Sequence, residues 1–83
     1  MATSAIYRIM PRKEGWIISL FGKVFGPCSS VDDAASAAIE AATKAIERGC
    51  KAEVQVYSDE RFFAIWRNGA FNDGETAKFL EHG

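Results

Sequence analysis

The sequence lacks any long apolar segment, and it has little histidine, cysteine or charge of one sign. No run of about 18 apolar residues is present, so no transmembrane helix is expected. Residues 1–4 carry neither the basic flank nor the apolar block of a secretory signal, so we expect a cytoplasmic protein. The sequence has ten lysines and arginines and eleven aspartates and glutamates. This near-balance gives no general attraction to nucleic acid or to an anionic membrane.

The few cysteines and the single histidine argue against a disulfide and a metal site. Cys28 and Cys50 flank an expected helix of about 18 residues, which holds them about 27 Å apart. A disulfide requires α-carbons within about 7 Å of each other. His82 is the only imidazole, and no C-x-x-C spacing occurs. Neither a metal nor a cofactor is therefore expected.

A catalytic constellation is also missing. Asp32 and Asp33 are adjacent and point in different directions, and a helix-capping role explains them better than acid–base chemistry. Cys28 precedes a helix start, and a small loop residue is the simplest interpretation of it. We predict no catalytic residue and no enzymatic activity.

What the sequence does contain is a strong helix signal over residues 31–48. Ser29 or Ser30 is a natural N-cap, and Gly49 is a natural C-cap. Small apolar residues recur at helical spacing and form one flat stripe. Because alanine fills little space, the surface packed on this stripe must come close and supply large side chains.

Two pairs of apolar segments flank the helix and supply those side chains. Residues 4–10 and 16–21 predict a hairpin with Ile9 opposite Ile18, followed by a short third strand at residues 23–25.

The second strand pair comprises residues 52–57 and 62–67. The register that collects its large apolar residues on one face pairs Val54 with Ile65 and Val56 with Phe63.

These elements predict one small α+β domain over residues 1–83, with a core at about 4–69 and a C-terminal tail at 70–83. The expected architecture is a two-layer sandwich in the order β-β-(β)-α-β-β. One long helix covers one face of an antiparallel or mixed sheet of four to five strands. The tail has Asp73 as a possible cap for a short second helix at residues 76–80.

The sheet face opposite the helix, called the reverse face below, is also rich in apolar residues. The predicted registers place these residues on it: Ile6, Arg8, Met10, Ile17, Ser19, Phe21, Glu53, Gln55, Tyr57, Phe62, Ala64 and Trp66. A solvated sheet face normally alternates to polar residues, so a contact surface is indicated.

We predict that a second copy of the protein covers the reverse face, since two-fold dimers are the commonest oligomers. The predicted interface residues are Ile6, Met10, Ile17, Phe21, Tyr57, Phe62 and Trp66. On this prediction, Trp66→Glu gives a soluble monomer. One alternative cover is the chain's own tail. The other is nucleic acid, with aromatic rings stacking on bases and Arg8, Arg61 and Arg67 contacting phosphates.

Four segments resemble a group of small bacterial proteins known as a domain of unknown function. They are Ile-Met-Pro-Arg at residues 9–12, Gly-Trp-Ile-Ile at 15–18, the helix start at 30–35, and Glu-Val-Gln-Val at 53–56. The resemblance covers about residues 5–67 and implies no activity and no functional residues.

A second resemblance is to antitoxins of the HicB type, whose half-domain also runs strand, strand, helix. Residues 26–28 stand where those proteins carry a Pro-Asp-Leu-Pro-Gly-like segment. This resemblance implies toxin neutralisation. From the residues themselves, the expected function is that of a small, soluble, non-catalytic interaction module.

Overall fold

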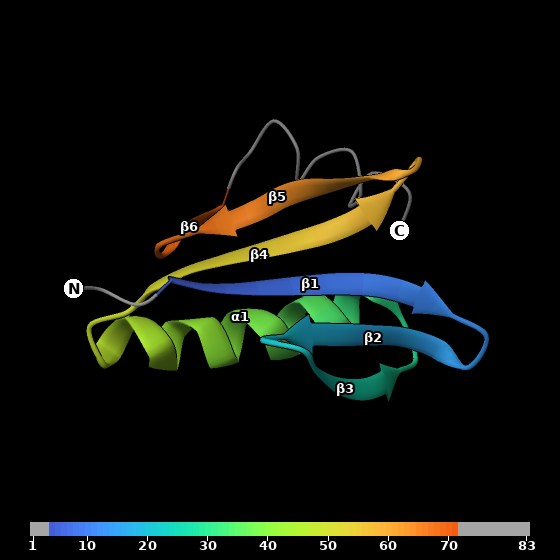
Figure 1. The fold of residues 1–83 in the computed structure, drawn as a ribbon, viewed down its shortest axis with the longest axis horizontal. Coiled ribbons are helices and arrows are strands. Elements are labelled where there is room, and N and C mark those ends of the chain that lie inside the picture. The colour runs from blue at the N-terminus through green and yellow to red at the C-terminus, as the bar shows by residue number, and fades with distance from the viewer. Residues whose placement is uncertain (1–3, 72–83) are drawn as a thin grey trace.

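The computed structural model describes residues 4–71 as one helix packed on a six-stranded mixed sheet (Figure 1). The elements, in chain order, are β1 (Ser4–Arg12), β2 (Gly15–Leu20), β3 (Lys23–Cys28), α1 (Val31–Glu47), β4 (Lys51–Ser58), β5 (Arg61–Arg67) and β6 (Ala70–Phe71). The predicted α+β class is confirmed, and the sheet has slightly more strands than expected. No helix in this part of the chain is long and apolar enough to cross a membrane.

The sheet order is β3-β2-β1-β4-β5-β6, with β1 and β4 as adjacent parallel strands at its centre. All other neighbouring strands are antiparallel. A parallel pair needs a long crossover, and α1 provides it between β3 and β4. The chain therefore forms one meander, crosses over through α1, and forms a second meander on the other side of β1.

Two-residue turns join the antiparallel strands, at residues 13–14, 21–22, 59–60 and 68–69. In the last three turns both residues have positive φ. That geometry matches the twist of the flanking strands and keeps a hairpin compact. The strands consequently run longer than predicted, and β6 begins at residue 70, where the sequence indicated a tail. The predicted short helix at residues 76–80 lies outside the described residues.

Both helix ends form as the sequence predicts. The Ser30 hydroxyl accepts a hydrogen bond of 3.1 Å from the Asp33 amide, as an N-cap does. At the other end Gly49 has a φ of 91°, and the Cys50 amide donates to the Ala45 carbonyl at 3.0 Å. This Schellman arrangement satisfies carbonyl groups that the helix itself leaves unpaired. Cys28 and Cys50 are both free cysteines.

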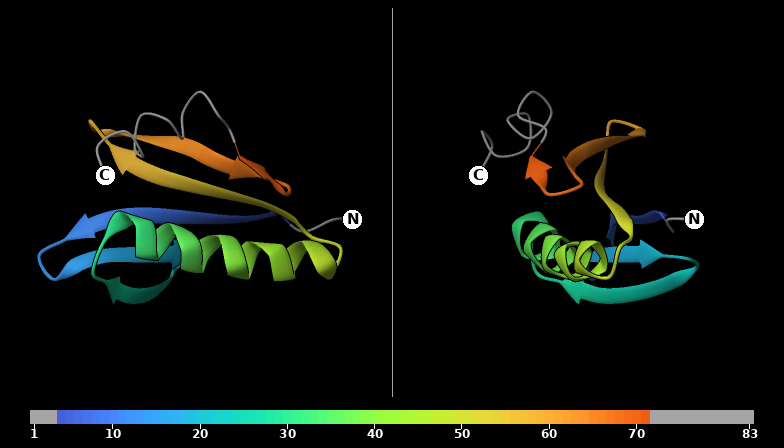
Figure 2. Two further views of the ribbon diagram at one scale, coloured as in Figure 1. Left: turned by 180° about the vertical axis from the view of Figure 1, so that it is seen from behind. Right: turned by 90° about the vertical axis from the view of Figure 1, so that its left-hand side faces the viewer.

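The alanine stripe faces the centre of the sheet. Ala34, Ala38 and Ala42 are fully buried, in the same cluster as the large buried residues Ile9 and Val54. α1 lies along one side of the sheet and packs on β1, β2, β3 and β4 (Figure 2). Small helix residues thus allow close approach, and the strands fill the core.

The edge of the sheet at β3 is irregular. Ile18 pairs with Phe25, but Trp16 pairs with Cys28, so β3 contains an extra residue between these pairs. Gly15 begins β2 at a φ of 139°, and a Cβ there would lie 2.3 Å from the Cys28 carbonyl oxygen. Only glycine permits this close approach of β3 to the start of β2.

A second irregularity corrects one predicted register. Val56 pairs with Phe63 as predicted, but Val54 lies opposite Trp66 and not opposite Ile65. The extra residue is a β-bulge. Ile65 and Trp66 are only 5% and 4% exposed and both belong to the core cluster. The prediction that Trp66 lies on the reverse face is therefore wrong, and Trp66→Glu is expected to unfold the protein.

Candidate interaction surface on the reverse face

An apolar row crosses four strands of the reverse face. Met10 pairs with Ile17 on β2, and Tyr57 pairs with Phe62 on β5. In the parallel register of β1 and β4 the last pair is Ile9 with Val56, and Met10 and Tyr57 are the residues that follow it. The Tyr57 and Phe62 rings meet edge to face, with centroids 5.2 Å apart. This row joins residues that are distant in sequence, because the crossover makes β1 and β4 neighbours.

A polar ladder lies beside the apolar row and comprises Arg8, Gln55, Glu53 and Arg67. Arg8 Nε donates to Gln55 Oε1 at 3.3 Å, and Gln55 Nε2 donates to Glu53 Oε2. Arg67 Nε donates to Glu53 Oε1 at 2.8 Å, which makes an ion pair. The Arg8 guanidinium also lies 5.2 Å from the centre of the Phe62 ring, within the range of a cation–π contact.

The seven predicted interface residues differ in exposure. Ile6 and Phe62 are each 38% exposed, and Phe21 is 69% exposed. Met10 and Tyr57 are half-buried. Ile17 is 8% exposed and offers almost no free surface, and Trp66 is in the core as described above. The reverse face is thus apolar in part, with Ile6, Phe21 and Phe62 as its exposed large side chains among those predicted.

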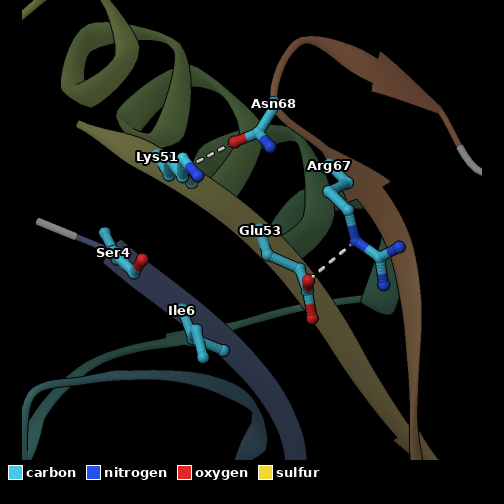
Figure 3. A pocket seen from close by; sticks show the side chains of 8 residues that line it. Ser4, Ile6, Lys51, Glu53, Arg67 and Asn68 are labelled. Carbon is cyan, nitrogen blue, oxygen red and sulfur yellow. Dashed lines mark hydrogen bonds and ion pairs between the residues drawn. The ribbon is translucent and has the colours of Figure 1, made fainter. Parts of the chain in front are cut away.

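Two hollows open on the same face. The first, called the Arg67 hollow, has a volume of about 150 Å³ and lies where β1, β4 and β5 meet (Figure 3). It is lined by Ser4, Ala5, Ile6, Lys51, Ala52, Glu53, Arg67 and Asn68. The second has a volume of about 290 Å³ and is lined by Ser4, Ile6, Arg8, Ser19, Phe21 and Gly22. Ile6 and Ser4 separate the two hollows, since both residues line each of them.

Asn68 fixes the wall of the Arg67 hollow. Its amide donates to the Ala52 carbonyl at 2.8 Å, and its side-chain oxygen accepts from the Ala52 amide at 2.9 Å. Its φ of 50° starts the turn into β6, and asparagine tolerates that conformation. The Asn68-Gly69 pair directly follows the strand predicted at residues 62–67. A two-residue hairpin is the structural role that this dipeptide commonly takes.

The three arginines of the nucleic-acid alternative do not lie together. Arg8 and Arg67 are on the reverse face and belong to the polar ladder. Arg61 pairs with Ser58 and lies over the Phe63 ring, 4.4 Å from its centre, on the helix side of the sheet. Glu53 neutralises Arg67, whereas Arg8 donates to the neutral Gln55 side chain.

The helix side carries a competing apolar hollow of about 270 Å³ between α1 and the β2–β3 hairpin. It is lined by Tyr7, Ile18, Leu20, Phe25, Ala37, Ala38 and Ala41. Phe25 is 48% exposed there. This hollow gives an independent surface against which an interface on the reverse face can be tested.

The described residues offer no arrangement for metal chemistry. Within residues 4–71, no group of three or more histidine, cysteine, aspartate or glutamate side chains is placed to hold a metal ion. Tyr7 is an ionisable residue of the core, and its pKa is raised chiefly by burial. The reverse face itself combines apolar and charged side chains.

The chain matches no family model, no curated protein and no solved structure. The two family resemblances drawn from the sequence stay predictions. Inference about function consequently rests on the geometry of the reverse face.

Proposed function

We propose that this protein is a cytoplasmic, non-catalytic interaction module that forms a homodimer through its reverse face. The observation that carries the proposal is the contrast between the two sheet faces. α1 covers the centre of one face, whereas the reverse face presents exposed Ile6, Phe21 and Phe62 around a polar ladder. Exposed apolar side chains grouped on one face are typical of surfaces that bind another protein.

The size of the reverse face supports a dimer. The described part of the chain measures 36 × 27 × 20 Å, and the sheet spans its broad side. A standard protein–protein interface uses about 800 Å² of surface on each partner. One face of this sheet is large enough to supply that area.

The sheet edges are poorly suited to pairing with another strand. β3 has an irregular register and contains Pro27, which has no amide hydrogen to donate. At the other edge, β6 has only two residues in the described sheet. Irregular, proline-containing and very short edges are protected against strand addition. A partner is therefore more readily accommodated on a face than at an edge.

The charges of the polar ladder suit a two-fold contact. Arg8 and Arg67 carry positive charge, Glu53 carries negative charge, and all three lie on one surface. A two-fold contact places the same three charges on both sides of the interface. Complementary charges of this kind fix the register of an interface more than they raise its affinity.

Sedimentation equilibrium tests this proposal directly. The wild-type protein is expected to behave as a dimer, and Ile6→Lys is expected to weaken association by about 100-fold or more. The reason is that each copy would bury an unpaired charge at a cost of several kcal/mol. Phe25→Lys is the matched control, because Phe25 is an exposed apolar residue on the helix side.

Two outcomes would contradict the homodimer. One is a wild-type monomer at all concentrations, and the other is dissociation by Phe25→Lys with an unchanged Ile6→Lys dimer. Oligonucleotide binding that weakens steeply with added salt would instead support the nucleic-acid alternative.

A further inference from the structure

Phe21 is an unusual residue for the position it occupies. It is the first residue of the turn between β2 and β3 and has a φ of 49°. Glycine, asparagine and aspartate favour this conformation, whereas a bulky side chain is strained in it. The Phe21 side chain is also 69% exposed, so packing within the described chain does not compensate for the strain.

The Arg67 hollow is open to solvent on the reverse face and has a volume of about 150 Å³. Ile6 borders it with an apolar side chain, and Arg67 and Glu53 lie at its side (Figure 3). Phe21 borders the neighbouring hollow on the same reverse face.

We propose that, in the dimer inferred above, the Phe21 ring of each protomer inserts into the Arg67 hollow of the other. This inference rests on the proposed homodimer and names its anchor. A projecting side chain and a hollow on one face can always be exchanged reciprocally, about a two-fold axis that bisects the line between them. The line from Phe21 at the end of β2 to the Arg67 hollow crosses β1. Its midpoint lies near Ile6, so the two-fold axis passes near this residue.

Arg67 provides a specific contact for the inserted ring. Its Nε is held by Glu53 at 2.8 Å, which fixes the orientation of the guanidinium plane. An arginine held in this way presents its face or its terminal nitrogens to an aromatic ring as a cation–π partner. Aromatic residues that fill a pocket beside an arginine are characteristic of interface hot spots.

The first experiment measures the dimer dissociation constant of Phe21→Asn. Asparagine suits the turn, so this variant is expected to fold at least as well as the wild type. Its dissociation constant is nevertheless expected to rise about 30-fold or more, because a hot-spot side chain is lost from both copies. Glu60→Asn is the matched control, since Glu60 has a φ of 65° in another turn of the same type. It is expected to leave the dissociation constant unchanged.

The second experiment is a complementation test with Ser4→Trp, which fills the Arg67 hollow from its border. A dimer of Phe21→Asn has no Phe21 ring to insert, and a dimer of Ser4→Trp has no open hollow. Each of these dimers therefore lacks both exchanged contacts. A mixture of Phe21→Asn and Ser4→Trp restores one contact, between Phe21 of one chain and the open hollow of the other. The mixed dimer is therefore expected to be about 10-fold tighter than either variant dimer. A variant that fails to fold cannot produce this gain.

The outcomes separate the anchor from the dimer itself. A wild-type monomer contradicts the proposed function and the anchor together. A wild-type dimer with an unchanged Phe21→Asn dimer overturns the anchor alone. Equal weakening by Glu60→Asn, or a mixture no tighter than its components, also overturns the insertion into the Arg67 hollow.

Discussion

Tyr7 shows how a single residue in the core responds to its surroundings. Its side chain is buried on β1, and burial raises the pKa of its hydroxyl above the ordinary value of 10.0. The nearby Cys50 thiol raises this pKa further, and Arg48 lowers it. Because the folded state disfavours tyrosinate, Tyr7 stabilises the fold below about pH 10, and that stabilisation is lost as the pH rises further.

Tyr7→Phe is expected to remove this alkaline sensitivity. The free energy of unfolding of the wild type should fall relative to that of Tyr7→Phe above pH 10, by at most about 1.4 kcal/mol per pH unit. Urea unfolding of both proteins from pH 7 to pH 11 measures the difference between their free energies of unfolding. In this difference the contributions of the titratable groups that both proteins share cancel. A constant difference across this range would show that the hydroxyl titrates normally in the folded protein.

At the scale of single elements, local signals predict what local interactions determine. Ser30 and Gly49 predict the ends of α1 because the caps are formed by neighbouring residues. The pairing of Ile9 with Ile18 also follows from a short turn and from the alternation of side chains between the two faces of each strand. The prediction placed Trp66 on the wrong face of the sheet. The β-bulge in β5 adds one residue, and a strict alternation of side chains between the two faces does not allow for it.

The polar ladder required information that the sequence pattern does not carry. Arg8 meets Gln55 because β1 and β4 are parallel neighbours, and the sequence pattern does not predict the order of the strands. The apolar row was predicted residue by residue, but its continuity across β1 and β4 depends on the same crossover. The Arg67 hollow likewise depends on the turn at Asn68, which brings its side chain back to Ala52.

The close contact between α1 and the sheet predicts opposite effects at two adjacent alanines. Ala38 is 1% exposed, so Ala38→Leu should push α1 away from the sheet and destabilise the fold by about 1–3 kcal/mol. Ala37 is exposed and lines the helix-side hollow with Leu20 and Phe25. Ala37→Leu should be neutral or slightly stabilising, because the added atoms extend into open apolar space.

Chemical denaturation measures both variants against the wild type. The prediction concerns the difference between them, because leucine replaces alanine in the same helix and the change in helix propensity is the same. Equal stability of the two variants would show that the alanine stripe does not set the distance between α1 and the sheet.

At the scale of the whole molecule, the two sheet faces have different roles. The helix side holds the core, which includes Trp66 and the buried alanines of α1. The reverse face holds the polar ladder, two hollows and the exposed side chains Ile6, Phe21 and Phe62. The proposed dimer joins two reverse faces, so it leaves the core of each protomer unchanged.

The most direct measurement of this arrangement is an isotope-filtered NOE spectrum of a mixture of ¹³C-labelled and unlabelled protein. The homodimer predicts intermolecular cross-peaks from the Ile6 methyl groups, and the exchanged anchor adds cross-peaks between Phe21 and Ile6 of different chains. An absence of intermolecular cross-peaks at high protein concentration, or cross-peaks confined to Leu20 and Phe25 on the helix side, would contradict association through the reverse face.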